Sequence, residues 1–151
     1  MSRHLAGAKP TQTQSAVRGL LQRWLRERQE LLSRYCALSA ALKLGASPTA
    51  TRGKLDRFCE VLVDYVCAGH FEVYRELLDA GKRRGEADGA ALYRLIVPTT
   101  AVALDFNDRY FRSASGETVP RDLSRLGQVL ASRFDWEDAL IGAQPGARAV
   151  A

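Results

Sequence analysis

The chain has 151 residues, 46% of them hydrophobic, which fits one domain that buries a single core without disulfides or metal. The net charge is +5, but residues 1–44 carry the excess, and a basic first segment on a near-neutral body is a weak signal for nucleic acid. Apolar runs such as Val61–Val63 and Ala101–Leu104 are far shorter than the roughly 20 residues of a membrane helix, so no membrane segment is expected. The first residues lack the apolar core of a secretory signal, which favours a cytoplasmic location.

The first predicted element is a long amphipathic helix over about 15–38, where apolar residues recur every three or four positions with arginines between them. A Gly-Ala-Ser-Pro sequence ends this segment, and Thr49 or Thr51 is expected to cap a second helix that runs to Gly69. A glycine in that position commonly adopts the left-handed conformation at a helix C-terminus. We therefore expect a break there, followed by a new helical segment over 70–80.

The second half of the chain predicts two more helices. After a polar, basic connection at 81–85, a long helix is expected over about 87–111, and Pro98 should kink or interrupt it. The last helix has Pro120 in its first turn and apolar residues at helical spacing as far as Ile141. Five helical segments joined by short connections predict an all-α, up-and-down bundle.

The predicted domain is thus a single helical bundle over residues 15–142, with a broken second helix and a kinked third long helix. The segments 1–14 and 143–151 lack hydrophobic periodicity, so we expect them to be flexible tails.

Groups suited to catalysis are few, and the sequence has no Gly-rich phosphate loop. Asp64 and His70 lie on either side of the predicted break, and a pair of this kind can serve in acid-base chemistry. A structural hydrogen bond between them is favoured, because no nucleophile or oxyanion donor is near in sequence. We expect neither enzymatic activity nor a cofactor.

Cysteine usage also argues against a metal centre. The chain has an odd number of cysteines, namely Cys36, Cys59 and Cys67, and their spacings match neither a disulfide framework nor a zinc site. The only histidines that could act as further ligands are His4 and His70. The three thiols are expected to be reduced and buried, with redox sensing as the alternative.

Asp64 is the most informative residue, because it lies in an apolar helical run between Val63 and Tyr65. Burying a bare carboxylate costs several kcal/mol or more, so Asp64 must be solvated, paired or protonated. Four aromatic residues lie nearby in sequence, namely Phe58, Tyr65, Phe71 and Tyr74. Helical periodicity does not place all four on one buried stripe, so we expect Tyr65 or Tyr74 at the surface beside Asp64, as in an interface hot spot.

Trp24 and Arg28, one turn apart on the first predicted helix, form a second candidate hot spot. The alternative is a core tryptophan covered by the stem of the arginine.

Three blocks of sequence carry a family resemblance. They are Arg23-Trp24-Leu25 with Arg28, the segment 56–74 with its Leu-Val-Asp-Tyr and Ala-Gly-His-Phe sequences, and Arg133-Phe134 with Glu137-Asp138. The fixed spacing within the central block is improbable by chance. Together the blocks resemble the Rsd/AlgQ family of bacterial anti-sigma factors, which bind the principal sigma factor of RNA polymerase.

This resemblance implies a bundle that binds region 4 of the principal sigma factor as a 1:1 complex and blocks its contacts with the −35 promoter element and core RNA polymerase. Asp64 matches the acidic residue that the family places in this contact. The residues expected to bind the partner are Trp24, Arg28, Asp64, Tyr65, His70, Phe71 and Tyr74. A homodimer of the free protein is left open.

Two alternatives from other classes remain. A DNA-binding regulator acting through the basic first helix would bind DNA without sigma and with steep salt dependence, although direct DNA binding is not expected. An enzyme built on Asp64 and His70 is the weaker alternative. Residues 82–112 match no motif and support none of these hypotheses.

Overall fold

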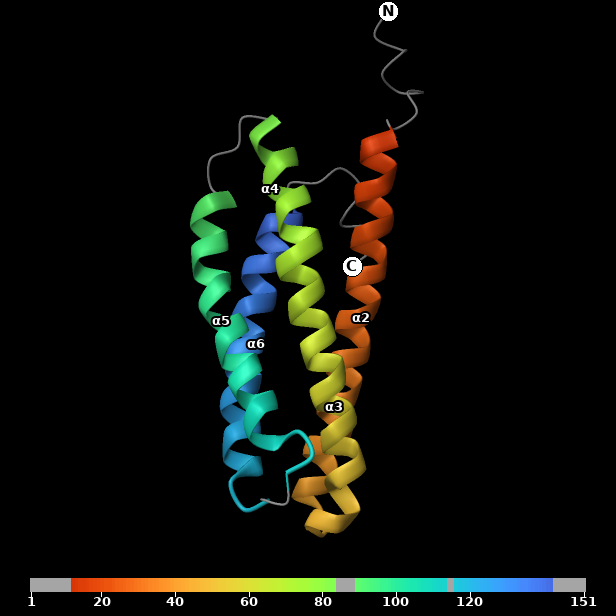
Figure 1. Ribbon diagram of the computed structural model, residues 1–151, viewed down its shortest axis with the longest axis vertical. Coiled ribbons are helices and arrows are strands. Elements are labelled where there is room, and N and C mark those ends of the chain that lie inside the picture. The colour runs from red at the N-terminus through yellow and green to blue at the C-terminus, as the bar shows by residue number, and fades with distance from the viewer. Residues whose placement is uncertain (1–11, 84–88, 114–115, 143–151) are drawn as a thin grey trace, which may run out of the picture.

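The computed structural model describes residues 12–83, 89–113 and 116–142, and within these ranges the protein is an all-α bundle of five α-helices. The elements are α2 (Gln12–Lys43), α3 (Pro48–Ala68), the π-helical turn η1 (Gly69–Val73), α4 (Tyr74–Arg83), α5 (Gly89–Tyr110) and α6 (Val119–Ile141). Figure 1 shows the long helices running alternately down and up the bundle, with α4 continuing upward from α3. The predicted all-α bundle is confirmed.

The predicted tails are largely untested, because residues 1–11 and 143–151 lie outside the described residues. At the N-terminal side the boundary differs from the prediction. The helix α2 begins at Gln12, so residues 12–14 belong to this helix and not to a tail.

The turn between α2 and α3 depends on two capping residues. Gly45 has a φ of 77°, the left-handed conformation that ends many helices. The Ser47 hydroxyl accepts a hydrogen bond from the Ala50 N–H at 3.2 Å and caps α3. The prediction of Thr49 or Thr51 as the cap was wrong, because the helix begins at the proline directly after Ser47.

Gly69 marks a change in helix type where a left-handed cap was predicted. Its φ of −56° and ψ of −52° are right-handed helical values, so the predicted conformation was wrong. The chain passes from α3 through the π-helical turn η1 directly into α4. A Cβ on Gly69 would lie 3.0 Å from the Trp24 ring and 3.1 Å from the Tyr74 hydroxyl, so glycine lets both rings pack close to the backbone.

The helix α5 is unbroken through Pro98, and Figure 1 shows its course bending part-way along. Its most apolar window has a mean hydropathy of 1.2, so α5 is the one described helix that could cross a membrane by length and composition alone. Core helices pass the same test, and α5 contributes Ile96, Ala103 and Phe106 to the core. It is also partly uncovered, because Leu95 and Val102 are exposed.

The α5–α6 end of the bundle is held by a buried tyrosine. The Tyr110 side chain is 1% exposed, and its hydroxyl pairs with Thr118 at 2.6 Å and donates to Asp122. Arg109 also donates to Asp122, at 2.9 Å. This cluster joins the end of α5 to the start of α6.

At Gly127 of α6, the Tyr35 side chain of α2 packs directly against the backbone. A Cβ there would lie 2.2 Å from the Tyr35 hydroxyl, which donates to the Leu123 carbonyl at 3.0 Å. We expect Gly127→Ala to lower the free energy of unfolding by about 1–3 kcal/mol, because the ring must move and lose this bond. Urea denaturation followed by circular dichroism measures the change.

Gly53 in α3 is the matched control, since a Cβ there meets nothing within 4 Å. We expect Gly53→Ala to raise the free energy of unfolding by about 0.5–1 kcal/mol through the lower entropy of the unfolded chain. A Gly127→Ala protein as stable as the Gly53→Ala protein would contradict the tight packing at Gly127.

Candidate functional site

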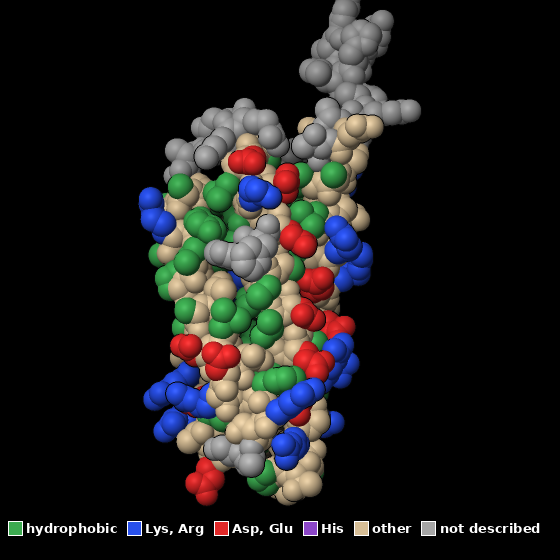
Figure 2. Space-filling view, in the orientation of Figure 1, with side chains coloured by type: hydrophobic (Ala, Val, Ile, Leu, Met, Phe, Trp, Pro, Cys, Tyr) green, Lys and Arg blue, Asp and Glu red, His purple; other side chains and the backbone are tan. Residues whose placement is uncertain are grey.

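Three carboxylates from consecutive elements form an acidic face: Glu27 of α2, Asp64 of α3 and Glu72 of η1. All three side chains are exposed. Burial, then the nearby charges of Asp64 and Glu72, raise the pKa of the Glu27 carboxyl, against a smaller opposing effect of Arg23. Figure 2 shows acidic side chains following the border between α3 and α2, beside hydrophobic side chains over α3, α4 and α5. The carboxylates are therefore close enough to repel one another.

In the part of the chain that the structure describes, no hydrogen bond or salt bridge joins Glu27, Asp64 or Glu72 to another side chain. Acidic residues one or two turns away differ. Glu30 and Glu60 both pair with Arg57, at 3.0 and 3.2 Å. The acidic face is thus the stretch of this surface where negative charge is not neutralised by the described chain.

The bundle also holds a buried carboxylate, Glu137 of α6, which is fully enclosed. It accepts hydrogen bonds from the Tyr65 hydroxyl at 2.6 Å, Arg133 Nε at 3.0 Å and Arg28 Nη2 at 3.2 Å. The Tyr74 hydroxyl donates to it as well. Four donors from four helices therefore converge on one side chain.

Arg133 is also fully buried, and both of its terminal nitrogens donate hydrogen bonds. Its Nη1 atom donates to the hydroxyls of Thr99 at 3.0 Å and Thr100 at 2.8 Å, and Nη2 donates to the Tyr74 hydroxyl at 2.5 Å. We call these residues the Glu137 cluster: Arg28, Tyr65, Tyr74, Thr99, Thr100, Arg133 and Glu137. Burial of ions is tolerated here because every charge has hydrogen-bonding partners.

Tyr65 and Tyr74 are 0% and 1% exposed, so the expectation that one of them reaches the surface beside Asp64 was wrong. Both hydroxyls point inward to Glu137. Burial, then the Glu137 carboxylate, raise the pKa of Tyr65 well above its usual range, so its hydroxyl stays protonated and keeps donating. Hydrogen bonding to a buried acid, which the sequence pattern did not reveal, draws both rings into the core.

Trp24 is 1% exposed and stacks on Tyr65, with 5.1 Å between ring centroids. The guanidinium of Arg28 lies 5.6 Å from the Trp24 ring centroid, so the alternative of a core tryptophan covered by an arginine is confirmed. Arg28 continues outward and donates to Asp138 at 2.5 Å. It therefore connects the buried cluster to the surface.

Two predicted site residues remain only partly placed. His70 and Phe71 belong to η1, but their side chains lie outside the described residues, and so does the predicted contact between Asp64 and His70. Asp64 itself is exposed and not enclosed by its own chain.

Sequence reasoning missed Glu27 and Glu72 as neighbours of Asp64, and it missed the burial of Glu137. A signal for Glu137 was present, because Leu130, Arg133 and Glu137 follow one another at three- and four-residue intervals on the core stripe of α6.

The cysteines do not form a site. All three are free, but only Cys59 is buried as predicted, whereas Cys36 is exposed and Cys67 is intermediate. Burial, followed by the charges of Asp56 and Glu60, raises the pKa of the Cys59 thiol to about 12, so this thiol is unreactive. No group of three His, Cys, Asp or Glu side chains among the described residues is placed to hold a metal ion.

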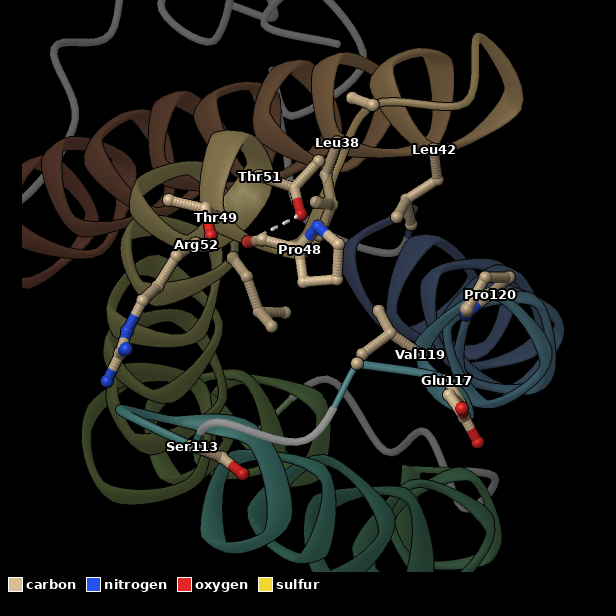
Figure 3. A pocket seen from close by; sticks show the side chains of 13 residues that line it. Leu38, Leu42, Pro48, Thr49, Thr51, Arg52, Ser113, Glu117, Val119 and Pro120 are labelled. Atoms are coloured by element: carbon tan, nitrogen blue, oxygen red, sulfur yellow. Dashed lines mark hydrogen bonds between the residues drawn. The ribbon is translucent and has the colours of Figure 1, made fainter.

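A hollow of about 460 Å³ lies at the opposite end of the bundle, between the start of α3 and the connection from α5 to α6. Its apolar wall includes Leu38, Leu55 and Val119. Figure 3 shows Arg52 and Glu117 on opposite sides of the hollow and pointing away from each other. Charged groups that diverge in this way do not form a catalytic set.

Comparisons with known proteins identify the family. The family model described as "Regulator of RNA polymerase sigma(70) subunit, Rsd/AlgQ" matches residues 5–144. The chain belongs to the Rsd/AlgQ family. This family comprises regulators of the sigma70 subunit and not enzymes, so the predictions of family and of a non-enzymatic regulator are confirmed.

Curated relatives named "Regulator of sigma D" support this assignment. The protein of Yersinia pseudotuberculosis serotype O:1b (strain IP 31758) is 30% identical over 139 residues, which cover 87% of this chain and 82% of the relative. That of Shigella boydii serotype 4 (strain Sb227) is 33% identical over 135 residues, covering 83% and 85%. That of Salmonella arizonae is 33% identical over 129 residues, covering 81% and 79%. No solved structure gives a significant match to the chain.

Removal of Glu137 alone should strongly destabilise this Rsd/AlgQ bundle. We expect Glu137→Ala to lower the free energy of unfolding by about 3–5 kcal/mol, because Arg133 then stays buried without its counter-ion. Urea denaturation measures the loss.

Asp138 provides the matched control, because it also accepts from Arg28 but its side chain is 56% exposed. We expect Asp138→Ala to cost at most about 1 kcal/mol. Equal losses for the two variants would contradict a structural role specific to the buried carboxylate.

Proposed function

We propose that this protein binds region 4 of the sigma70 subunit through the acidic face and thereby prevents sigma from contacting the −35 promoter element and core RNA polymerase. The observation that supports this proposal is the group of exposed carboxylates Glu27, Asp64 and Glu72, which have no partner among the described residues, on a member of the family described as regulators of this subunit. Inhibition then results from occlusion of the sigma surface.

The electrostatics of the acidic face favour a basic partner. Burial, and then repulsion from Asp64 and Glu72, raise the pKa of the Glu27 carboxyl, so ionisation of this group is less favourable in the folded chain. A segment that contacts DNA phosphates is rich in Lys and Arg. When such a segment docks, its cations replace the mutual repulsion with attraction, and exclusion of water by the neighbouring apolar surface strengthens the pairing.

The predicted partner-binding residues divide into two groups in this proposal. Asp64 contacts the sigma factor directly, and His70 and Phe71, in the turn next to Glu72, belong to the same contact surface. Trp24, Tyr65 and Tyr74 are buried, so they support this surface from below, together with Arg28. We infer a 1:1 complex, because the chain has one acidic face of this kind among its described residues. A regulator of RNA polymerase acts in the cytoplasm, where transcription takes place.

Net charge does not argue against a basic partner. The excess positive charge lies on exposed arginines of α2 such as Arg18, Arg23 and Arg26. Salt screens exposed charges beyond about 8–10 Å, so the local carboxylates dominate at the acidic face. In the alternative hypothesis of direct DNA binding, these arginines would contact the DNA phosphates, and the experiment below tests this hypothesis.

Asp64 gives the most direct test. We expect Asp64→Arg to weaken binding to sigma region 4 about 100-fold, because like charges across an interface cost several kcal/mol. Titration calorimetry at physiological salt measures the affinity for sigma region 4. A separate titration with a promoter-length DNA duplex tests whether the protein binds DNA directly. Glu60→Gln, one turn away and already paired with Arg57, should bind like the parent protein.

The milder Asp64→Asn variant should separate stability from binding. Removing one repelling charge should raise the free energy of unfolding by at most about 0.5 kcal/mol after solvent screening, while sigma binding weakens. DNA binding without sigma binding, or unchanged sigma affinity in Asp64→Arg, would refute the proposed role of the acidic face.

For the free protein we propose homodimerisation through the outer face of α5. Residues 95–104 contain no charged side chain, although Leu95 and Val102 are 47% and 40% exposed. Antiparallel pairing of two α5 helices about the centre of this stretch brings Arg94 of each copy opposite Asp105 of the other. The surface is therefore complementary to itself.

Val102→Glu tests this dimer, because it places a carboxylate in the apolar centre of the contact. We expect the variant to sediment as a monomer at concentrations where the parent protein forms dimers, and to keep its affinity for sigma region 4. A parent protein that stays monomeric at about millimolar concentration, where the weakest specific contacts form, would rule the contact out.

A further inference from the structure

Each carboxylate of the acidic face lies one or two positions before a member of the Glu137 cluster in the chain. Glu27 precedes Arg28, Asp64 precedes Tyr65, and Glu72 precedes Tyr74 by two positions. We propose that the Glu137 cluster is a positioning device: it fixes the rotation of α2, α3 and η1 so that the three carboxylates converge on one partner. This inference rests on the proposed function, and it assigns to buried residues a part in affinity.

The geometry for α2 and α3 follows from shared hydrogen bonds. Arg28 Nε donates to the Tyr65 hydroxyl at 3.0 Å, and both residues donate to Glu137, at 3.2 and 2.6 Å. Successive residues of a helix lie about 100° apart around its axis. When Arg28 and Tyr65 are held inward, Glu27 and Asp64 are therefore held on the outer surface, where Asp64 is close enough to raise the pKa of the Glu27 carboxyl.

The π-helical turn η1 connects Glu72 to the same arrangement. Such a turn inserts an extra residue relative to an α-helix and rotates the residues that follow, and π-turns occur frequently at functional sites. Here the rotation directs Tyr74 onto Glu137 and Arg133. Gly69 leaves the room that the Tyr74 and Trp24 rings need. Glu72, within the turn, is thereby brought close enough to influence Glu27.

A purely stabilising role does not account for the composition of the cluster. Buried ion pairs contribute little net stability compared with apolar residues of the same volume, and their best-attested use is to specify one arrangement of the packed elements. The Glu137 cluster joins α2, α3, α4, α5 and α6 through directional bonds. Its members Arg28, Tyr65 and Tyr74 follow the acidic residues in the chain, whereas Tyr110 forms a separate cluster between α5 and α6.

The test removes single hydroxyl groups and leaves the rings in place. We expect Tyr65→Phe and Tyr74→Phe each to weaken binding to sigma region 4 about fivefold to tenfold, the lower end of typical coupling between sites. Tyr110→Phe is the matched control, because it deletes an equally buried, hydrogen-bonded hydroxyl far from the acidic face. It should lose comparable stability and keep the parent affinity.

Two readouts distinguish positioning from stability. In a double-mutant cycle, Tyr65→Phe and Asp64→Asn should be non-additive, since the first misplaces the group that the second removes. In the free protein, the pKa of the Glu27 carboxyl, followed by NMR, should fall toward its ordinary value in Tyr65→Phe as Asp64 and Glu72 move away, and should not change in Tyr110→Phe.

The outcomes separate this inference from the proposed function. If Asp64→Arg leaves sigma binding unchanged, the proposed function fails, whereas the NMR titration still tests the positioning. If Asp64→Arg abolishes binding but Tyr65→Phe and Tyr74→Phe behave like Tyr110→Phe in affinity and in the Glu27 titration, the positioning role is overturned.

Discussion

A single buried carboxylate, Glu137, organises this bundle. Its two oxygens accept from Arg28, Tyr65, Tyr74 and Arg133, which come from α2, α3, α4 and α6, and Arg133 extends the connection to Thr99 in α5. An ion this deep is tolerable only when all of its donors are present together. The helices are therefore constrained in rotation as well as in distance, which apolar packing alone specifies less strictly.

This constraint explains why the aromatic residues lie inside. Tyr65 and Tyr74 combine large apolar rings with hydroxyl groups that satisfy Glu137, and Trp24 stacks on Tyr65. A phenylalanine core would fill the same space but leave the carboxylate short of donors. The π-helical turn at Gly69–Val73 belongs to the same arrangement, because it gives Tyr74 the orientation that the cluster needs.

On the acidic face, unlike in the Glu137 cluster, the carboxylates are not paired with cations of the described chain. Glu27, Asp64 and Glu72 lie exposed and unpaired among the described residues, while Glu30 and Glu60 nearby are paired with Arg57. Uncompensated charge of one sign on a rigid support is a feature of recognition surfaces, and it is maintained at some cost in stability. This member of a family of sigma70 regulators thus combines a basic overall charge with a local acidic surface.

The sequence by itself determined the helical bundle, the approximate helix boundaries and the family, because periodicity, turn residues and a specific motif are local properties of the chain. It did not determine the inward orientation of Tyr65 and Tyr74, the right-handed π-turn at Gly69, or the grouping of Glu27 and Glu72 with Asp64. The orientation of the two tyrosines involves Glu137 and Arg133, which lie more than 60 residues away in the chain from Tyr65. Hydrogen bonds to a buried ion join residues that are distant in sequence, so only the tertiary structure reveals them.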